Sequence, residues 1–343
     1  MQIFNKKEHY VFLESYFMYA AWYSKTGKAG EVIELGQMEK PRPRSHEVLI
    51  KIKASGINPS DVKKRDGARG QMDFKKIIPH SDGSGIIESI GSKVSSHRIN
   101  QRVWVWNAAW KRSFGTAAEY LTIPSNQAVE LPENVSFEEG ACIGIPIITA
   151  HSCFNFGESL NNKTVLVTGG AGVVSRYIIQ IAKILGSKVI TTVSSELKKQ
   201  IAQEAGADII LNYKKEDVVQ KILNVTSQKG VDKIIDVDFG ANLLISTKVL
   251  KHNCEIVSYG SMGNPNPVLP FYNFMFKGLT LRTIIVYDLD NDKRNRAIKD
   301  INSWLKNDML SHNIQKVFSL KEIVDAHLAT EDPKRIGSIV LAI

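Results

Sequence analysis

The feature that most restricts the fold is a short apolar run that leads directly into glycines. Residues 165–168 have the composition of a buried strand, residues 169–175 are rich in glycine, and a helical pattern then extends to Leu185. A strand, a glycine-rich turn and a helix in this order form the unit that holds the pyrophosphate of a dinucleotide on helix N–H groups. The fingerprint here is Gly170-x-Gly172-x-x-Ser175, with a serine in place of the third glycine. The predicted phosphate-binding residues are Gly169, Gly170, Ala171, Gly172, Val173 and Val174.

The rest of the chain surrounds this turn with two different patterns. Residues 19–140 show short alternating strands such as Glu47–Ala54, Ile86–Ile90 and Arg102–Trp106, which are typical of a barrel or sandwich. After a capping box at Ser136, apolar strands alternate with helices, which predicts a parallel sheet covered on both faces. The predicted strands of this sheet are Thr164–Thr168, Lys188–Val193, Ile209–Leu211, Lys233–Val237, Cys254–Ser258 and Leu279–Val286.

The C-terminal segment is too short to form a domain by itself. It contains a helical pattern over Arg296–Lys306, a second capping box at Ser319 and a closing strand over Ile339–Ile343. We therefore expect an α/β protein in which residues 18–140 and 288–343 form a β domain and residues 141–287 form a doubly wound nucleotide domain. Residues 1–17 are expected to be an extension, disordered or not part of the genuine chain, because a clean strand pattern opens at Met18.

The end of the second predicted strand indicates which nucleotide binds. Enzymes that use NAD tend to place an acidic residue there for the ribose 2′-hydroxyl. This chain instead has Ser194 and Ser195, followed by Glu196 and Lys198. Hydroxyls and a cation suit a 2′-phosphate, so the sequence favours NADP(H). A solvated helix face is the alternative interpretation of the lysines.

Composition limits the remaining classes. The net charge is +9, from 44 Lys+Arg against 35 Asp+Glu, but the lysines form no long run, so a solvated basic surface is favoured over nucleic-acid binding. The three cysteines include no CxxC pair, which fits a reducing, cytoplasmic compartment and argues against a cysteine zinc site. No apolar stretch reaches the roughly 18 residues of a membrane span.

Several further segments, in this order and spacing, resemble a known family. The segments are 54–61 (ASGINPSD), 79–85 (PHSDGSG), 114–120 (FGTAAEY), 140–146 (GACIGIP) with Thr149-Ala150, and the glycine loop. They resemble the zinc-free quinone oxidoreductases, similar to zeta-crystallin, of the medium-chain dehydrogenases/reductases. The resemblance implies a GroES-like β-barrel catalytic domain and a Rossmann domain, and a homodimer or homotetramer that forms through the nucleotide-domain sheets.

The resemblance also implies site residues. The positions that bind catalytic zinc in related alcohol dehydrogenases correspond to Asn58, Ser81 and Ile145, none of which is a good zinc ligand, so no metal is expected. Asn58 and Thr149 correspond to the nicotinamide end, and Asp61 is expected to brace the catalytic loop. The other cofactor positions implied are Ser194, Lys198 and Tyr213 at the 2′-phosphate, and Tyr259, Gly260, Ser261, Ile285 and Val286 at the nicotinamide side. Lys63 stands where some quinone reductases have a tyrosine, and the expected pocket residues are Lys63, Trp106, Asn107, Trp110, Phe271 and Tyr287.

These features together predict an NADPH:quinone oxidoreductase that works without zinc. A quinone becomes aromatic on reduction, so strong acid catalysis is not required, and no Ser-His-Asp, Cys-His or paired-carboxylate site is evident. One alternative is an NADPH-dependent enoyl or alkenal reductase. Another, of a different class, is a nucleotide-gated RNA-binding protein, which only the positive charge supports.

Overall fold

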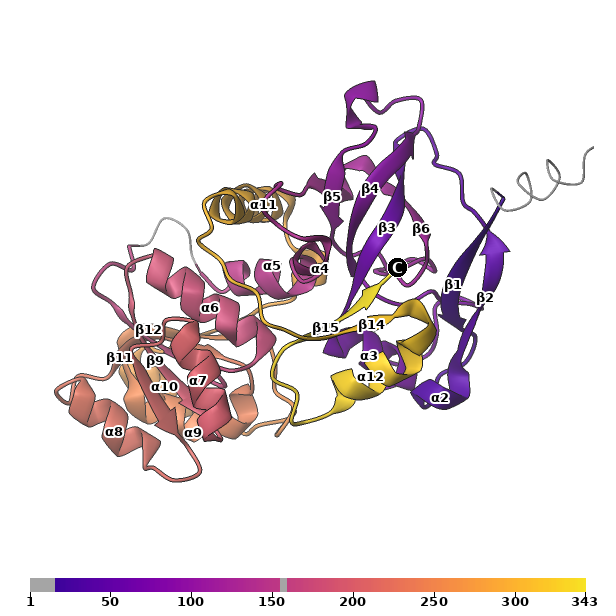
Figure 1. The fold of residues 1–343 in the computed structure, drawn as a ribbon. Coiled ribbons are helices and arrows are strands. Elements are labelled where there is room, and N and C mark those ends of the chain that lie inside the picture. Colours follow the sequence, from indigo (N-terminus) through magenta and orange to yellow (C-terminus); the bar gives the residue numbers. More distant parts are fainter. Residues whose placement is uncertain (1–15, 155–158) are drawn as a thin grey trace, which may run out of the picture. The chain divides into compact units, whose positions relative to one another are not determined.

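The computed structural model describes residues 16–154 and 159–343 (Figure 1). It divides into two compact units, one that comprises residues up to Ile145 together with His312–Ile343, and one that comprises Pro146–Ser311. We call them the β unit and the nucleotide unit. The predicted N-terminal extension lies almost entirely outside the described residues; of its last positions, Phe17 already belongs to strand β1.

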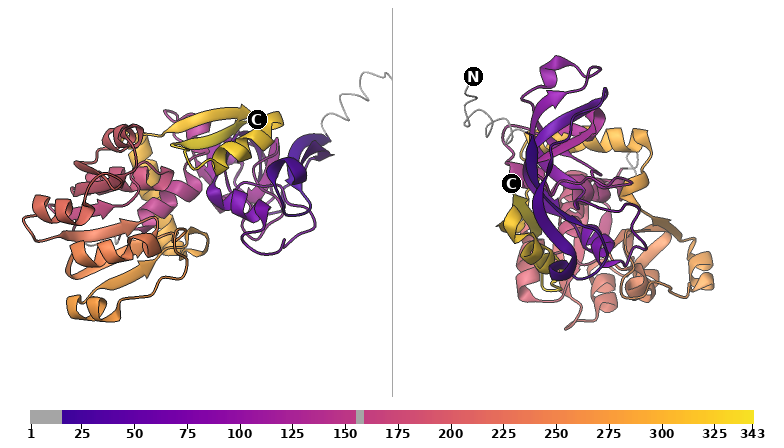
Figure 2. Two further views of the ribbon diagram at one scale, coloured as in Figure 1. Left: turned by 90° about the horizontal axis from the view of Figure 1, so that it is seen from below. Right: turned by 90° about the vertical axis from the view of Figure 1, so that its right-hand side faces the viewer.

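The β unit is built on a seven-stranded sheet with the order β14-β15-β3-β4-β5-β7, in which β6 also pairs with β3, and on a separate hairpin β1-β2. In the right-hand view of Figure 2 its long indigo and purple strands run along the unit. The strands are β1 (Phe17–Tyr23), β2 (Ile33–Glu39), β3 (Glu47–Ile57), β4 (Asp82–Ile90), β5 (Arg102–Val105), β6 (Tyr120–Pro124), β7 (Ala128–Glu130), β14 (Ile314–Ser319) and β15 (Ser338–Ala342). The helices are α2 (Ala29–Val32), α3 (Pro59–Asp66), α4 (Phe137–Gly140) and α12 (Ile323–Glu331), with short 3-10 turns at Ser96–Arg98, Ser125–Gln127 and Leu320–Glu322.

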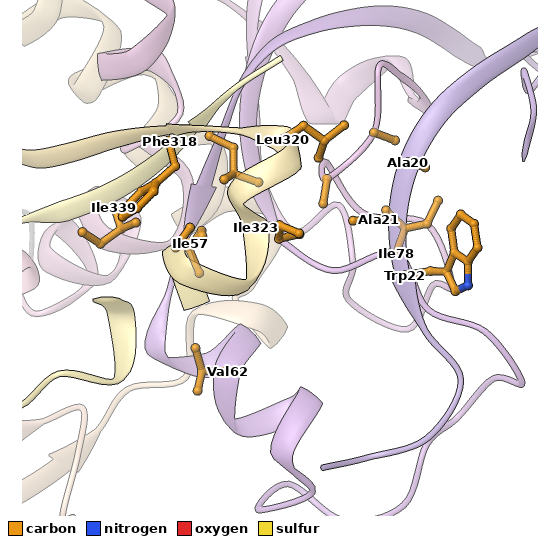
Figure 3. Packing of buried hydrophobic residues seen from close by; sticks show 14 of the residues in the cluster. Ala20, Ala21, Trp22, Ile57, Val62, Ile78, Phe318, Leu320, Ile323 and Ile339 are labelled. Atoms are coloured by element: carbon orange, nitrogen blue, oxygen red, sulfur yellow. The ribbon is translucent and has the colours of Figure 1, made fainter. Parts of the chain in front are cut away.

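The C-terminal strands complete this sheet, as the sequence predicted. β15 pairs antiparallel with β3, with Ile339 opposite Ile57, and β14 pairs parallel with β15. Figure 3 shows the apolar side chains that pack around the C-terminal strands. Phe318, Leu320 and Ile323 of the C-terminal segment belong to one buried cluster with N-terminal side chains such as Ile57. Burial of an aliphatic side chain contributes about 1.5–3 kcal/mol, so the two ends of the chain stabilise one core.

The nucleotide unit contains a six-stranded parallel sheet with the order β10-β9-β8-β11-β12-β13. The strands are β8 (Thr164–Val167), β9 (Lys188–Val193), β10 (Ile209–Asn212), β11 (Val231–Asp236), β12 (Leu250–Ser258) and β13 (Thr280–Thr283). The helices are α5 (Gly144–Ser152), which begins in the β unit, α6 (Val173–Ile184), α7 (Glu196–Glu204), α8 (Val218–Val225), α9 (Phe239–Val249), α10 (Phe271–Lys277) and α11 (Asn291–Lys306), with a 3-10 turn at Val286–Asp288.

The strand order of this sheet reverses at β8. The chain proceeds from β8 through β9 to the edge strand β10 and then returns to the other side of β8 with β11. One face of the sheet packs against α8, α9 and α10 through side chains such as Leu166, Ile190, Ile234 and Phe239. In open α/β sheets, ligands bind beyond the carboxyl ends of the strands at such a reversal. The turn after β8 lies at this point, so the predicted doubly wound fold is confirmed.

The border between the units differs from the predicted one. The sequence pattern placed the divisions after residues 140 and 287, whereas the structure divides after Ile145 and Ser311. The reason is α11, which begins five residues earlier than predicted because Asp290 caps its N-terminus. Arg294 of α11 donates to the carbonyls of Val286, Tyr287 and Leu289, which bonds the helix to the nucleotide unit.

The last predicted strand of the sheet is shorter than expected. β13 covers only Thr280–Thr283 instead of Leu279–Val286, and the chain turns into a 3-10 helix from Val286. Ile284 still donates its N–H to the Ser258 carbonyl, which holds the start of this turn against the end of β12.

Candidate active site

The glycine turn after β8 has the backbone that a phosphate group needs. Gly169 has a φ of +63°, which a residue with a side chain rarely adopts. Gly172 is the N-cap of α6 and, among the described residues, no side chain caps this helix. The first N–H groups of an α-helix have no acceptor within the helix and lie at the positive end of its dipole. Val173 and Val174 are the first residues of α6, so their N–H groups are suited to hold an anion.

Thr192 of β9 fixes this turn through its hydroxyl and its carbonyl. Thr192 accepts the Gly169 N–H on Oγ1 at 3.1 Å and the Gly170 N–H on its carbonyl at 3.0 Å. A side chain on Gly170 would place its Cβ 2.1 Å from Thr191 Oγ1, so the turn can pass this close to β9 only as glycine. The loop is therefore held in its shape before any ligand arrives.

Ser175 takes the place of the third glycine and makes two hydrogen bonds. Its Oγ donates to the Thr168 carbonyl at 3.0 Å and lies 2.8 Å from the Tyr259 hydroxyl. The side chain is fully buried, so α6 still packs closely against β8. Where the usual fingerprint has a glycine without a side chain, Ser175 therefore links the end of β8 to Tyr259, the residue after β12, through hydrogen bonds of its hydroxyl.

The residues predicted for the 2′-phosphate follow two paired strand ends. Asn212 of β10 lies opposite Val193 of β9, and the Tyr213 N–H donates to the Val193 carbonyl at 3.1 Å. This places Tyr213 beside Ser194 along the sheet edge. Ser195 is the N-cap of α7 and accepts the Lys198 N–H, so its hydroxyl has a structural role as well. The Tyr213 side chain is 52% exposed, which leaves it accessible to a ligand.

The other cofactor residues predicted in the nucleotide unit lie on the segments that follow β12 and β13. The Gly260 carbonyl accepts the Phe239 N–H and Ser261 Oγ accepts the Gly240 N–H, so the segment after β12 is bonded to the start of α9. Val286 is buried, whereas Ile285 is exposed. Ile285 lines a cavity of about 670 Å³ together with His151, Arg282 and Arg296.

Three further predicted residues of this unit differ in burial. Thr149 is buried on α5, Tyr287 is half-buried and Phe271 is exposed on α10.

In the β unit, Asn58 is part of a buried hydrogen-bond cluster. Its Nδ2 donates to Oδ2 of Asp82 at 2.8 Å. The Ile145 N–H, at the start of α5, donates to both carboxylate oxygens of Asp82 at 2.9 and 3.0 Å. Asp82 is 1% exposed, and burial raises its pKa well above the usual range, while the bonds from Asn58 and Ile145 oppose this effect. Asp82 thereby joins three segments that are distant in the sequence.

Asp61 accepts a backbone hydrogen bond from the same loop. Its Oδ2 accepts the Asn58 N–H at 2.8 Å in a capping box that opens α3. Burial raises the pKa of the Asp61 carboxyl to about 7, against the lowering effects of the Asn58 N–H and of Lys64. The two acids therefore hold Asn58 from its backbone and from its side chain.

His80 lies beside these residues, but its ring turns away into the core. Its Nδ1 lies 2.9 Å from Ser55 Oγ, and its Nε2 lies 3.0 Å from Nε2 of His327. Burial holds the pKa of His80 well below its usual range and lowers that of His327 to about 3. The pair is a neutral, hydrogen-bonded part of the core.

The positions that correspond to zinc ligands do not fit a zinc ion. Asn58 offers an amide that bonds to Asp82, Ser81 a neutral hydroxyl and Ile145 an aliphatic side chain, whereas zinc prefers Cys, His and carboxylate ligands. Within residues 16–154 and 159–343, no group of three or more His, Cys, Asp or Glu side chains is arranged to bind a metal.

The expected pocket residues of the β unit lie on two segments. Lys63 is half-buried on α3, and burial lowers its pKa. Trp106, Asn107 and Trp110 belong to the loop after β5, which is bonded to the Ser81 carbonyl through the Ala108 N–H at 2.9 Å. This loop therefore lies next to the segment that carries Asp82.

Sequence reasoning missed the groups that position the predicted residues. In the β unit this group is Asp82, which accepts from Asn58. In the nucleotide unit the groups are Thr192, which accepts from Gly169, and Thr168, whose Oγ1 donates to Asp236 at 2.7 Å. A signal is present in the sequence, since Asp82 directly follows Ser81, and Thr192 lies one residue before Val193, the last residue of β9. What the sequence does not contain is the pairing of Asp82 with Asn58, because the two residues meet only when β3 and β4 align.

Comparison with known proteins agrees with the fold. Two family profiles match, an alcohol dehydrogenase GroES-like domain over residues 44–133 and a zinc-binding dehydrogenase over residues 174–303. Together they define the class as a medium-chain dehydrogenase/reductase, which uses NAD(P) as its cofactor.

Individual relatives narrow this class. The quinone oxidoreductase of Mus musculus is 35% identical over 237 residues, which cover 68% of this chain and 70% of the mouse protein. A mycobacterial quinone oxidoreductase superposes with a TM-score of 0.84 at 25% identity, over 95% of this chain and all of the other. A second mycobacterial structure, complexed with NADPH, superposes with a TM-score of 0.82 at 25% identity over the same shares of the two chains. The chain belongs to the quinone oxidoreductase family.

Proposed function

We propose that the protein reduces quinones with NADPH and without a metal ion. The observation that carries the proposal is the donor set at Asn58, Ser81 and Ile145. These groups cannot activate an alcohol through zinc, so they favour an acceptor that is already electron-poor. Relatives named quinone oxidoreductases and a relative complexed with NADPH support it.

NADPH, when bound, supplies a hydride from C4 of its nicotinamide ring to the quinone. The quinone takes up this hydride and one proton and becomes a hydroquinone, while the cofactor leaves as NADP⁺. The Asn58 amide donates a hydrogen bond to the quinone oxygen on which negative charge develops. Water supplies the proton. The N–H groups at the start of α6 would hold the pyrophosphate, and Ser194, Lys198 and Tyr213 would hold the 2′-phosphate.

The test is NADPH oxidation by the purified protein with 1,4-benzoquinone and, in parallel, with a conjugated enone. We expect faster turnover of the quinone, unchanged by a metal chelator. Faster turnover of the enone would show that the protein is an enoyl or alkenal reductase. In that reaction the Asn58 amide would donate to the carbonyl oxygen of the enone. Loss of turnover with the chelator would contradict the metal-free reaction.

We also propose that the protein forms a homodimer through its nucleotide unit. β13 lies at the edge of the six-stranded sheet, and α10 exposes the aromatic side chains Phe271, Tyr272 and Phe276, the last with 72% of its surface accessible. An unpaired sheet edge beside exposed aromatic side chains is typical of a protein interface.

Light scattering tests the dimer. The wild type should have twice the mass of one chain, and Phe276→Lys should dissociate. Leu244→Lys on α9, another exposed apolar position at 65%, is the control and should leave the dimer intact. A monomeric wild type would contradict the proposal.

The three cysteines, Cys142, Cys153 and Cys254, form no disulfide, which supports a reducing, cytoplasmic site of action. Among the described residues, no helix combines the length and the apolar character needed to cross a bilayer.

A further inference from the structure

The cavity of about 670 Å³ in the nucleotide unit has the size of a small-molecule site, for which about 300–1,000 Å³ is typical. Its lining comes from the end of α5, from β13 and the turn after it, and from the first turns of α11. All of these residues belong to the nucleotide unit. The cavity opens to solvent, since Ile285 is 59% exposed and the Arg296 side chain is 54% exposed.

One part of the lining is apolar. It consists of Phe154, which is buried, of Ile284 and Leu289, which are half-buried, and of Ile285. Side chains of this kind suit a flat, apolar ring. Ile285 is also one of the residues predicted at the nicotinamide side of the cofactor, so a ring bound here would lie beside the predicted position of the nicotinamide.

Positively charged side chains from two elements line the same cavity. Arg282 of β13 is held in place, because it donates to the carbonyls of Ser152 at 3.0 Å and of Cys153 at 2.9 Å. Lys293 and Arg296 of α11 are three residues apart, so they lie on one face of the helix. The cavity therefore combines apolar side chains with cations.

The carboxylates of the lining are Asp288 and Asp290. Asp290 is engaged as the N-cap of α11, where its side chain accepts the N–H of Asp292 at 2.9 Å. Burial lowers the pKa of His151, the remaining titratable residue among the described lining residues, so it carries no charge at neutral pH.

Two acids just outside the lining also affect this charge. Glu255 accepts from Arg282 at 3.2 Å, and Asp300 lies 3.9 Å from Arg296 and 2.9 Å from His151. Arg282 is therefore balanced by a close ion pair, whereas Arg296 has only a distant carboxylate. Lys293 and Arg296 are the cations best placed to meet an anion.

We propose that this cavity binds the acceptor and favours quinones that carry an anionic substituent on the ring, such as a sulfonate or a carboxylate. Lys293 and Arg296 determine this specificity by binding the anion, while the apolar side chains contact the ring. The inference rests on the proposed function and deepens it, because it names the class of quinone.

Steady-state kinetics with 1,4-naphthoquinone and 1,4-naphthoquinone-2-sulfonate test the specificity. The ratio of kcat/KM for the sulfonated over the plain quinone is compared between proteins, which removes the difference in intrinsic reactivity. We expect this ratio to fall about fivefold in the double variant Lys293→Gln/Arg296→Gln. The control is Lys299→Gln, an exposed position of α11 outside the lining, which should leave the ratio unchanged. The wild-type ratio in the double variant would overturn the proposal.

Calorimetric titration with naphthalene-2-sulfonate, which accepts no hydride, measures the binding without turnover. The wild type should bind it saturably, the double variant about fivefold more weakly, and Arg296→Lys, which keeps the charge, within about twofold of the wild type. Absence of binding to the wild type, or equal binding to the double variant, would overturn the proposal.

Two further results separate the possible failures. If the double variant does not fold, Lys293→Gln alone, at an exposed position, should weaken binding about twofold, and no change would overturn the proposal. If the wild type reduces neither quinone, the proposed function fails, while the titration with naphthalene-2-sulfonate still decides whether the cavity binds an aromatic anion.

Discussion

In the β unit the polar groups of the site are buried and bonded to one another, whereas in the nucleotide unit the groups expected to meet the ligand's phosphate are accessible. Asn58 is 7% exposed and held by two carboxyl groups, but Tyr213 is 52% exposed. The buried arrangement fixes a geometry in advance, which is the condition for stabilising a transition state. In the nucleotide unit, exposed side chains such as Tyr213 would take a single conformation only when the ligand binds.

This difference predicts which property each substitution changes. Changes in the buried cluster should alter stability and kcat, since its members have no freedom to rearrange. Changes at the proposed 2′-phosphate site should alter affinity for the nucleotide and leave stability unaffected, because those side chains have few contacts to lose.

The largest expected effect is on the pH dependence of stability. The pKa of Asp61 is raised to about 7 in the folded protein, from an ordinary value of 3.8. The folded state therefore retains a proton that the unfolded state has lost. The stability that this proton contributes is fully present below pH 3.8 and decreases by about 1.4 kcal/mol per pH unit until the pH passes about 7.

Denaturant unfolding at several pH values measures this effect as the difference between the wild type and Asp61→Asn. The difference removes the contribution of His327, whose depressed pKa acts in the opposite direction, with stability lost as the pH falls from 6.5 toward 3. It includes a part from Asp82, because the charge of Asp61 contributes to the raised pKa of Asp82. A difference that does not change between pH 4 and 7 would contradict the raised pKa.

The next largest effect is expected for Gly144→Ala. The added Cβ would lie 2.2 Å from Asp82 Oδ1 and 2.9 Å from the Val105 carbonyl. We expect a loss of about 2–3 kcal/mol in stability from overpacking and at least a tenfold lower kcat, because Asp82 must move. Thermal unfolding and steady-state kinetics measure the two. Gly70→Ala offers no matching clash, and its loss of stability should come without a loss of kcat. Wild-type kcat in Gly144→Ala would show that the position of Asp82 is unimportant.

A smaller effect is expected in the nucleotide unit. Lys198→Ala should raise the Kd for NADPH about tenfold, equivalent to about 1.4 kcal/mol, and leave that for NADH unchanged, since only NADPH carries the 2′-phosphate. Lys199→Ala is the matched control, because Lys199 faces Glu196 on the surface at 3.9 Å. Equal effects on the two nucleotides would refute the role of Lys198.

The smallest effect on binding is expected for Ser175→Gly, which restores the usual fingerprint. The variant loses the bonds to Thr168 and Tyr259 and should lose about 1 kcal/mol of stability. The Kd for NADPH should change less than threefold, because Thr192 still fixes the loop. The partner variant Tyr259→Phe should cost less in the Ser175→Gly background than alone. A large loss of NADPH binding would mean that Ser175 contacts the nucleotide itself.

Much of the fold could be predicted from the sequence because its signals are local. The strand Lys188–Val193 has the predicted bounds, and the capping boxes at Ser136 and Ser319 begin their helices as expected. The unit border at Ser311 was missed because the bonds of Arg294 and α11 to the nucleotide unit are tertiary contacts.

Candidate residues of the site can be named from the sequence, but their arrangement cannot. Asn58 could be named from its motif, and the absence of an acid after β9 could be read directly. The bond between Asp82 and Asn58 depends on the register of β3 and β4, in which Gly56 lies opposite Asp82. Burial of Asp61, and with it the raised pKa, likewise exists only in the folded chain.

The central claim is that this chain is an NADPH-binding reductase whose nucleotide lies on the turn after β8. Titration of the wild-type protein with NADPH and with NADH, followed by nucleotide fluorescence, tests it most directly. We predict saturable binding of NADPH, at least tenfold tighter than that of NADH. No binding of NADPH, or tighter binding of NADH, would contradict the account.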